Sequence, residues 1–130
     1  MIQLAALLTT ALLFGGMVLY SFGFAAFLFT TLPGPLAGTT LRRAFPHFYL
    51  FVLVTAGVGA ALLWPVDPTG AAWLAAVAVT TLPTRQLLMP AINNATDTGA
   101  KKRFKVLHSA SVFITLAHIA AAGWVLSRFV

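Results

Sequence analysis

Long apolar stretches alternate with short polar connections along this chain of 130 residues. Four of the stretches approach or exceed about 20 residues, the length that a helix needs to cross the hydrocarbon core of a bilayer. The pattern predicts membrane-spanning helices over residues 2–32, 44–64, 71–92 and 104–126. Because short connections make consecutive helices antiparallel, we expect an all-α membrane protein: a four-transmembrane-helix antiparallel bundle, with residues 1–130 as one integral membrane domain.

Proline and glycine mark the ends of the predicted helices. Residues 31–35 have the sequence TLPGP, which predicts the end of the first helix, and Pro46 is expected in the first turn of the second. Residues 64–70, WPVDPTG, predict a tight turn before the third helix. Pro83 lies inside that helix, where a missing backbone donor predicts a kink. Arg85 lies beyond the kink, and we expect its guanidinium to extend to water.

The composition indicates that lipid surrounds the protein. The chain is 60% hydrophobic and 8% charged, with a mean hydropathy of +0.95. A soluble domain carries about a quarter charged residues, so this chain cannot cover a surface that faces water. The net charge of +6 does not predict a nucleic-acid partner, because basic connections beside a membrane meet anionic head groups first. The chain has no cysteine, which excludes disulfides and thiolate metal sites.

The distribution of charge predicts the orientation. The first and third connections contain most of the basic residues, while the only charged residue of the second connection is Asp67. The positive-inside rule, by which basic connections stay in the cytoplasm, then places the first and third connections there and both termini outside. The chain is thus expected to be a multi-pass protein of the inner or plasma membrane. The three tryptophans are expected at the outer interface: Trp64, Trp73 and Trp124. Five basic residues are predicted to face anionic lipid head groups: Arg42, Arg43, Lys101, Lys102 and Lys105.

A group of polar residues is predicted at the inner interface, where the third helix ends and the fourth begins. Its members are Asn93, Asp97, Arg103, His108 and Ser111. Asp97 is the only acid on that side, and we expect it to pair with one of the nearby basic residues: Arg85, Lys101 or Arg103. Such a pair favours a structural role in joining two helices, and a polar pocket for a substrate or a proton is the alternative.

Histidines provide the candidate cofactor site. His47 and His108 begin the second and fourth predicted helices on the same side, and two imidazoles can ligate haem iron or copper. No other residue pattern predicts a cofactor. His118 lies near the middle of the fourth helix, where a neutral ring bonded to a neighbouring helix is the commoner state.

The chain lacks the signatures of an enzyme. Its two acids are predicted on opposite sides of the membrane, and no nucleophile elbow, zinc-protease motif or phosphate loop is present. We therefore expect a non-enzymatic accessory or scaffolding subunit, or a protein of membrane homeostasis, within a larger membrane complex or a homo-oligomer. One alternative is a haem- or copper-binding membrane protein that uses His47 and His108. Another is a small oligomeric transporter with a polar site at Asp97 and His108.

Four short segments carry a resemblance to a known family. They are GGMVLYSF at 15–22, FPHFY at 45–49, PAINNATD at 90–97 and RFKVLHSAS at 103–111. In these segments the chain resembles the transmembrane protein 205-like family of four-span proteins of unknown function. The resemblance implies a membrane bundle and supplies no reaction. Thr96 and Thr115 depart from it, since a basic residue and an asparagine are expected there. The first helix is also similar to copper-resistance D-type membrane proteins, which keeps the copper alternative open.

Overall fold

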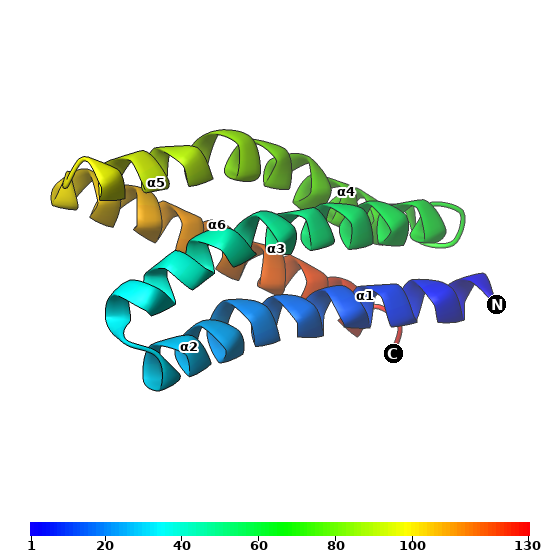
Figure 1. Ribbon diagram of the computed structural model, residues 1–130. Coiled ribbons are helices and arrows are strands. Elements are labelled where there is room, and N and C mark those ends of the chain that lie inside the picture. Colours follow the sequence, from blue (N-terminus) through cyan, green and yellow to red (C-terminus); the bar gives the residue numbers. More distant parts are fainter.

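The computed structural model describes residues 1–130 and is helical throughout, with no strand. The first helical segment comprises α1 (Ile2–Val18), the π-helical turn η1 (Leu19–Phe24) and α2 (Ala25–Thr31). Next comes α3 (Gly34–Leu63). The third segment comprises α4 (Pro68–Pro83), the π-helical turn η2 (Thr84–Leu88) and α5 (Met89–Asp97), and α6 (Lys101–Ser127) is the fourth. Figure 1 shows successive segments running back and forth, with both termini toward one end.

Three of the segments are long and apolar enough to cross a membrane: Ile2–Thr31, Gly34–Leu63 and Lys101–Ser127. The number of helical segments agrees with the four predicted helices. The third segment, Pro68–Asp97, is not one of the three, and Arg85 and Gln86 interrupt its apolar run.

The second helix begins ten residues before its predicted start at residue 44. The first helix ends at Thr31, one residue before its predicted end, but α3 begins at Gly34. Pro35 falls in the first turn of α3, where a missing N–H leaves no hydrogen bond unmade. The hydroxyls of Thr39 and Thr40 donate to backbone carbonyls four residues earlier, at 2.9 and 2.7 Å, and so lie within the helix. The placement of Pro46 in a first turn was therefore wrong, since it lies inside α3.

The third segment passes through Pro83 and continues as the π-helical turn η2. Pro83 and Pro90 both lack a backbone donor, so the regular ladder of bonds four residues apart is incomplete around them. The N–H of Met89 donates instead to the carbonyl of Thr84, five residues earlier. Arg85 is half-buried here, and its Nε donates to the carbonyl of Pro46 in α3 at 3.2 Å. Its Nη1 donates to the side chain of the exposed Gln86 at 3.0 Å, and the extension of its guanidinium to water stays a prediction.

The turn between the third and fourth segments contains Gly99, which has a φ of +68°. Glycine adopts this left-handed conformation without the steric cost of a side chain, so it suits the end of a helix. The backbone N–H of Ala100 then donates to the carbonyl of Ala95 at 2.9 Å, which closes the end of α5. As a result α6 begins at Lys101, three residues before its predicted start.

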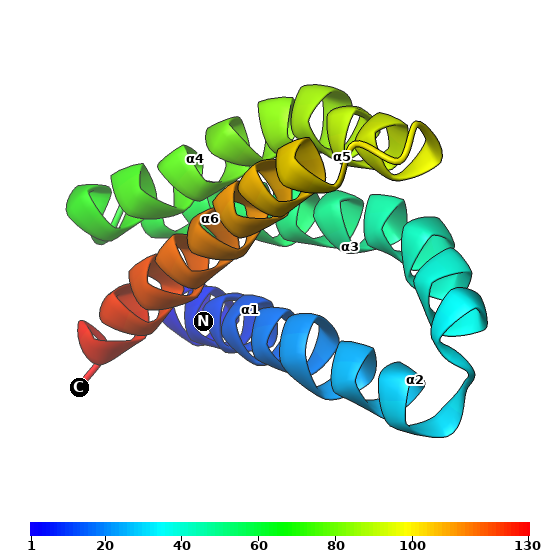
Figure 2. The same ribbon diagram turned by 90° about the vertical axis from the view of Figure 1, so that its left-hand side faces the viewer.

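The core lies where α3 packs against α4 and against the first segment. Its largest fully buried side chains include Phe48, Leu13, Met17, Leu63 and Leu74. Figure 2 shows α6 passing from the end of α5 toward α1, which it also contacts. Only 24 of the 130 residues are buried, and large apolar side chains are exposed along every segment. A surface of this kind suits contact with lipid rather than water.

Candidate functional site

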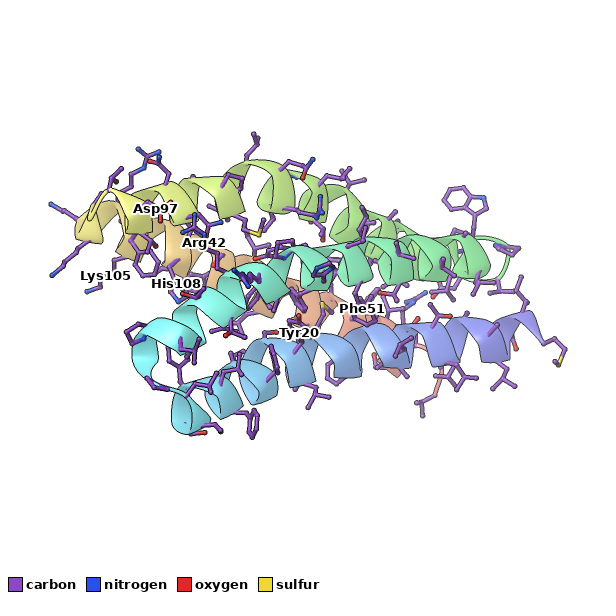
Figure 3. The ribbon with its side chains drawn as sticks, in the orientation of Figure 1. Tyr20, Arg42, Phe51, Asp97, Lys105 and His108 are labelled. Carbon is purple, nitrogen blue, oxygen red and sulfur yellow. The ribbon has the colours of Figure 1, made fainter.

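Charged and tryptophan side chains gather at the two ends of the molecule. The end with the α2–α3 and α5–α6 connections, here the basic end, carries Arg42, Arg43, Asp97, Lys101, Lys102, Arg103 and Lys105. Figure 3 labels Arg42, Asp97 and Lys105 at this end. The end with both termini and the α3–α4 connection, here the Trp end, carries Trp64, Asp67, Trp73, Trp124 and Arg128. The polar residues predicted to form a site therefore belong to the basic end.

Asp97 forms an ion pair, but its partner is Arg42 of α3. The two guanidinium nitrogens Nη1 and Nη2 donate to the two carboxylate oxygens at 2.6 and 2.8 Å. This hydrogen-bonded contact holds the pKa of Asp97 below its usual value. The prediction that Asp97 pairs with Arg85, Lys101 or Arg103 was therefore wrong. The pair joins the end of α5 to α3 of the preceding segment, 55 residues away in sequence, and not to α6 as predicted.

The other members of the predicted polar group do not form a network with Asp97. The Ser111 hydroxyl donates to the backbone carbonyl of His108 at 2.7 Å, within α6. The His108 ring lies parallel to Phe104, with 5.4 Å between ring centroids. No side-chain hydrogen bond joins Asn93, Arg103 or His108 to one another or to Asp97, and Arg103 is exposed. These residues share one end of the molecule without sharing a site.

The three histidines lie in different surroundings. His47 lines a groove between α3 and the first segment, while His108 stacks on its own helix, and no hydrogen bond joins the two rings. No group of three His, Cys, Asp or Glu side chains that could hold a metal is present. His118 lies 2.7 Å from the Thr80 hydroxyl of α4. Because that hydroxyl already donates to the carbonyl of Ala76, His118 Nε2 is the donor to Thr80.

A groove beside His47 opens at the surface of the molecule, and its volume is about 590 Å³. Sequence reasoning missed it. Its apolar wall comes from the first segment and from α3, through Leu12, Leu19, Phe27, Phe48 and Phe51 among others. Figure 3 shows Tyr20 and Phe51 in the space between these two elements.

An aromatic cluster fixes the spacing of the groove walls. The Tyr20 hydroxyl donates to the Ala44 carbonyl of α3 at 2.9 Å. Its ring stacks on Phe48 at 5.1 Å and meets Phe45 edge-on at 6.0 Å. Tyr20 lies in η1, and π-helical turns often occur at functional sites. The FPHFY segment and the hydroxyl of Tyr20 were visible in the sequence, but nothing there indicated that they meet.

A close approach of backbone and ring closes part of the groove floor. A Cβ atom added at Gly16 would lie 2.5 Å from Phe51 Cζ, so the Phe51 ring rests directly on the glycine. Gly23 also lines the groove, and there an added Cβ would meet only Leu19 of its own segment, at 3.2 Å. Glycine therefore serves two purposes in this groove: it admits Phe51 at one level and leaves open space at another.

The Trp end contains a second ion pair. Arg128 donates through Nε and Nη2 to the two oxygens of Asp67, at 2.6 and 2.7 Å. The hydrogen bond from Arg128 lowers the pKa of Asp67 to about 2. The Arg128 guanidinium also lies 4.8 Å from the centroid of Trp124, whose ring is 5.5 Å from that of Trp73. The pair ties the C-terminal end of the chain to the α3–α4 connection.

Comparison with known proteins places the chain in a family. A comparison with curated proteins gave no match, and a comparison with solved structures gave none either. The family model of a domain of unknown function, DUF4149, matches residues 8–101. That range includes the groove, Arg42 and both aspartates. Since it spans more than half of the 130 residues, the chain belongs to the DUF4149 family.

Proposed function

We propose that all four helical segments cross the inner or plasma membrane as an antiparallel bundle, with the basic end in the cytoplasm and both termini outside. The observation that carries this proposal is the separation of side chains along the segments: ionised groups lie mainly at the two ends, and exposed apolar groups lie between them. Basic residues at one end and tryptophans at the other suit cytoplasmic and outer interfaces. The exposed Arg43, Lys101, Lys102 and Lys105 would then face anionic head groups.

The third segment is the hardest of the four to place in a bilayer, and its contacts support a crossing. Its three elements contain 16, 5 and 9 residues, which together equal the 30 residues of α3 beside it. At a rise of about 1.5 Å per residue this length exceeds the hydrocarbon thickness of about 30 Å. Arg85 has protein partners, because Nε bonds the Pro46 carbonyl and Nη1 bonds Gln86 at 3.0 Å. Such bonds reduce the cost of a cation near the bilayer.

We further propose that the protein acts without a catalytic centre, as an accessory or scaffolding subunit. Both aspartate carboxylates of the chain are engaged by arginines, which leaves no unpaired aspartate for acid–base chemistry. Gly15 and Gly57 have no atom of another segment within 4 Å of an added Cβ, so neither is used for packing inside the chain. Small residues of this kind let a helix of another membrane protein approach closely. Within the DUF4149 family, the FPHFY and PAINNATD segments support a relationship to the transmembrane protein 205-like proteins.

Two measurements test this proposal. Membranes that contain the chain are washed at high pH, and the protein is expected to stay in the membrane fraction; its release would contradict insertion. The chain is then purified in mild detergent, where a bound membrane protein or a second copy is expected. Gly57→Leu should release that partner, while Gly34→Leu, a matched change in the first turn of α3, should retain it. A monomer without any associated protein would contradict the role as a subunit.

A further inference from the structure

We propose that the groove between α3 and the first segment binds one acyl chain of an anionic phospholipid, whose phosphate is held by Arg43 and His47. The proposal rests on the membrane insertion proposed above, because the bilayer supplies the lipid. The shape of the groove, its depth and the unpaired charge beside it each point to this occupant.

The groove is long and narrow. On the first segment it is lined by residues spaced three or four apart, which lie on one face of a helix: Leu12, Gly16, Leu19, Gly23 and Phe27. At a rise of about 1.5 Å per residue, the fifteen steps from the first to the last cover about 22 Å. The volume of about 590 Å³ is spread along this length, so the groove is narrow for its length. A helix is about 10–12 Å across, so the groove suits a single flexible chain better than a partner helix.

The part of the groove from Tyr20 toward the Trp end lies at the depth of an acyl chain below its head group. The bond from the Tyr20 hydroxyl to the Ala44 carbonyl places these two residues at one level. From that level the groove continues past Gly16 and Phe51 toward the Trp end. The second apolar stretch of the sequence starts at residue 44, so this part of the groove lies in the hydrocarbon and Arg43 lies at its boundary.

The charge beside the groove suits an anion from outside the chain. Arg43 and His47 are four residues apart on α3 and therefore share a face, and His47 lines the groove. The only two acids, Asp67 and Asp97, are already bound by Arg128 and Arg42. Arg43 is exposed and has no ion pair. A lipid phosphate accepts charge-assisted hydrogen bonds from a guanidinium and from an imidazole N–H, so it matches this pair of donors.

Native mass spectrometry of the full chain tests the proposal. The purified protein is mixed in mild detergent with equal amounts of dioleoyl phosphatidylglycerol and dioleoyl phosphatidylcholine. One phosphatidylglycerol should remain bound per chain, with a preference of about tenfold over the zwitterionic lipid. Arg43→Gln should abolish the preference, and Arg43→Lys should retain most of it. Gly23→Leu should lower retention of both lipids, because the new side chain fills the groove without striking α3.

Two matched variants control for general effects. Lys105→Gln removes one exposed cation of the same end away from the groove, and Gly38→Leu adds the same side chain to α3 at an exposed position outside the groove. Both should bind phosphatidylglycerol as the unmodified chain does. The thermal midpoint of each variant in detergent establishes that it is folded. A loss of binding in Lys105→Gln equal to that in Arg43→Gln would overturn the proposed site.

The remaining outcomes also decide the question. Equal retention of the two lipids, a bound mass equal to a free fatty acid, or a dimer that Gly23→Leu dissociates would each overturn the proposal. A chain that resists the high-pH wash but retains no phosphatidylglycerol would overturn the lipid site alone. A chain that the wash releases would overturn the proposed membrane insertion itself, so failures of the two proposals can be told apart.

Discussion

The two ends of the molecule contain the same pair of side chains in different surroundings. At the Trp end Arg128 binds Asp67, and at the basic end Arg42 binds Asp97, each through two hydrogen bonds of 2.6–2.8 Å. The Trp-end pair is partly covered, with side-chain exposures of 35% for the arginine and 21% for the aspartate. The basic-end pair is more open, at 43% and 55%. Water and salt therefore weaken the basic-end pair more.

The neighbours of the two pairs differ as well. Arg128 lies over the ring of Trp124, which in turn contacts Trp73 of α4, so the Trp-end pair belongs to a cluster from three elements. Near Asp97 the other charged groups are cations without partners. Geometry alone does not set the strength of an ion pair. We infer that the Trp end holds α6 against the α3–α4 connection, whereas the basic end can exchange its pairing with anionic lipid.

The largest effect is expected from removing an aromatic ring at the Trp end. Trp73→Ala loses the contact with Trp124 and should lower the free energy of unfolding by about 1 kcal/mol or more. Thermal unfolding in detergent measures the change. Trp64→Ala is the matched control, since Trp64 is 66% exposed and has no aromatic partner. Equal losses in the two variants would contradict the cluster.

A smaller effect is expected from neutralising each aspartate in turn. Asp67→Asn should lower the thermal midpoint by a few degrees, because it leaves the partly covered Arg128 without its partner. Asp97→Asn should lower the thermal midpoint less, and this effect of Asp97→Asn relative to the unmodified chain should disappear at high salt. Unfolding of both variants at low and high ionic strength measures this comparison. A larger loss in Asp97→Asn would reverse the proposed order of the two ends.

The smallest effect on the thermal midpoint is expected from lowering the pH. The pKa of Asp67 is lowered from 3.8 to about 2 in the folded protein, so its ionised form stabilises the fold. That contribution is complete above the unfolded value of 3.8 and is lost as the pH falls through about 2. The difference in thermal midpoint between the unmodified chain and Asp67→Asn should therefore shrink between about pH 4 and pH 2. A difference that does not change over this range would contradict the role of the Arg128 bond.

The sequence was sufficient for the helical fold and for the placement of polar groups at the ends, because both follow from local composition. Apolar length predicts helices in lipid, and residues 31–35 end the first helix whatever surrounds them. The start of α3 was missed because Pro35 and Pro46 are both compatible with a first turn, and only the structure shows which one lies there. The two π-helical turns were missed because apolar periodicity does not distinguish them from an ordinary helix.

The contacts of the site could not be predicted for a different reason. Arg42 and Asp97 are 55 residues apart, and a pairing at that distance depends on how α3 and α5 are arranged. The approach of Phe51 to Gly16 depends in the same way on the packing of α3 against α1. By contrast, the partner helix of His118 lies next to α6, and the expected bond to a neighbouring helix was confirmed by its contact with Thr80. The prediction for His118 named only a neighbouring helix, whereas the other two contacts required a particular partner residue.

The central claim is that the third segment crosses the membrane and so places the Trp end and the basic end on opposite sides. The chain has no cysteine, so one introduced by Thr69→Cys or by Thr98→Cys is its only thiol. These positions lie at the two ends of that segment, and both are exposed. A membrane-impermeant maleimide applied to intact cells should label Thr69→Cys at once and Thr98→Cys only after permeabilisation. Labelling of both variants from the same side would contradict a membrane protein with four crossings.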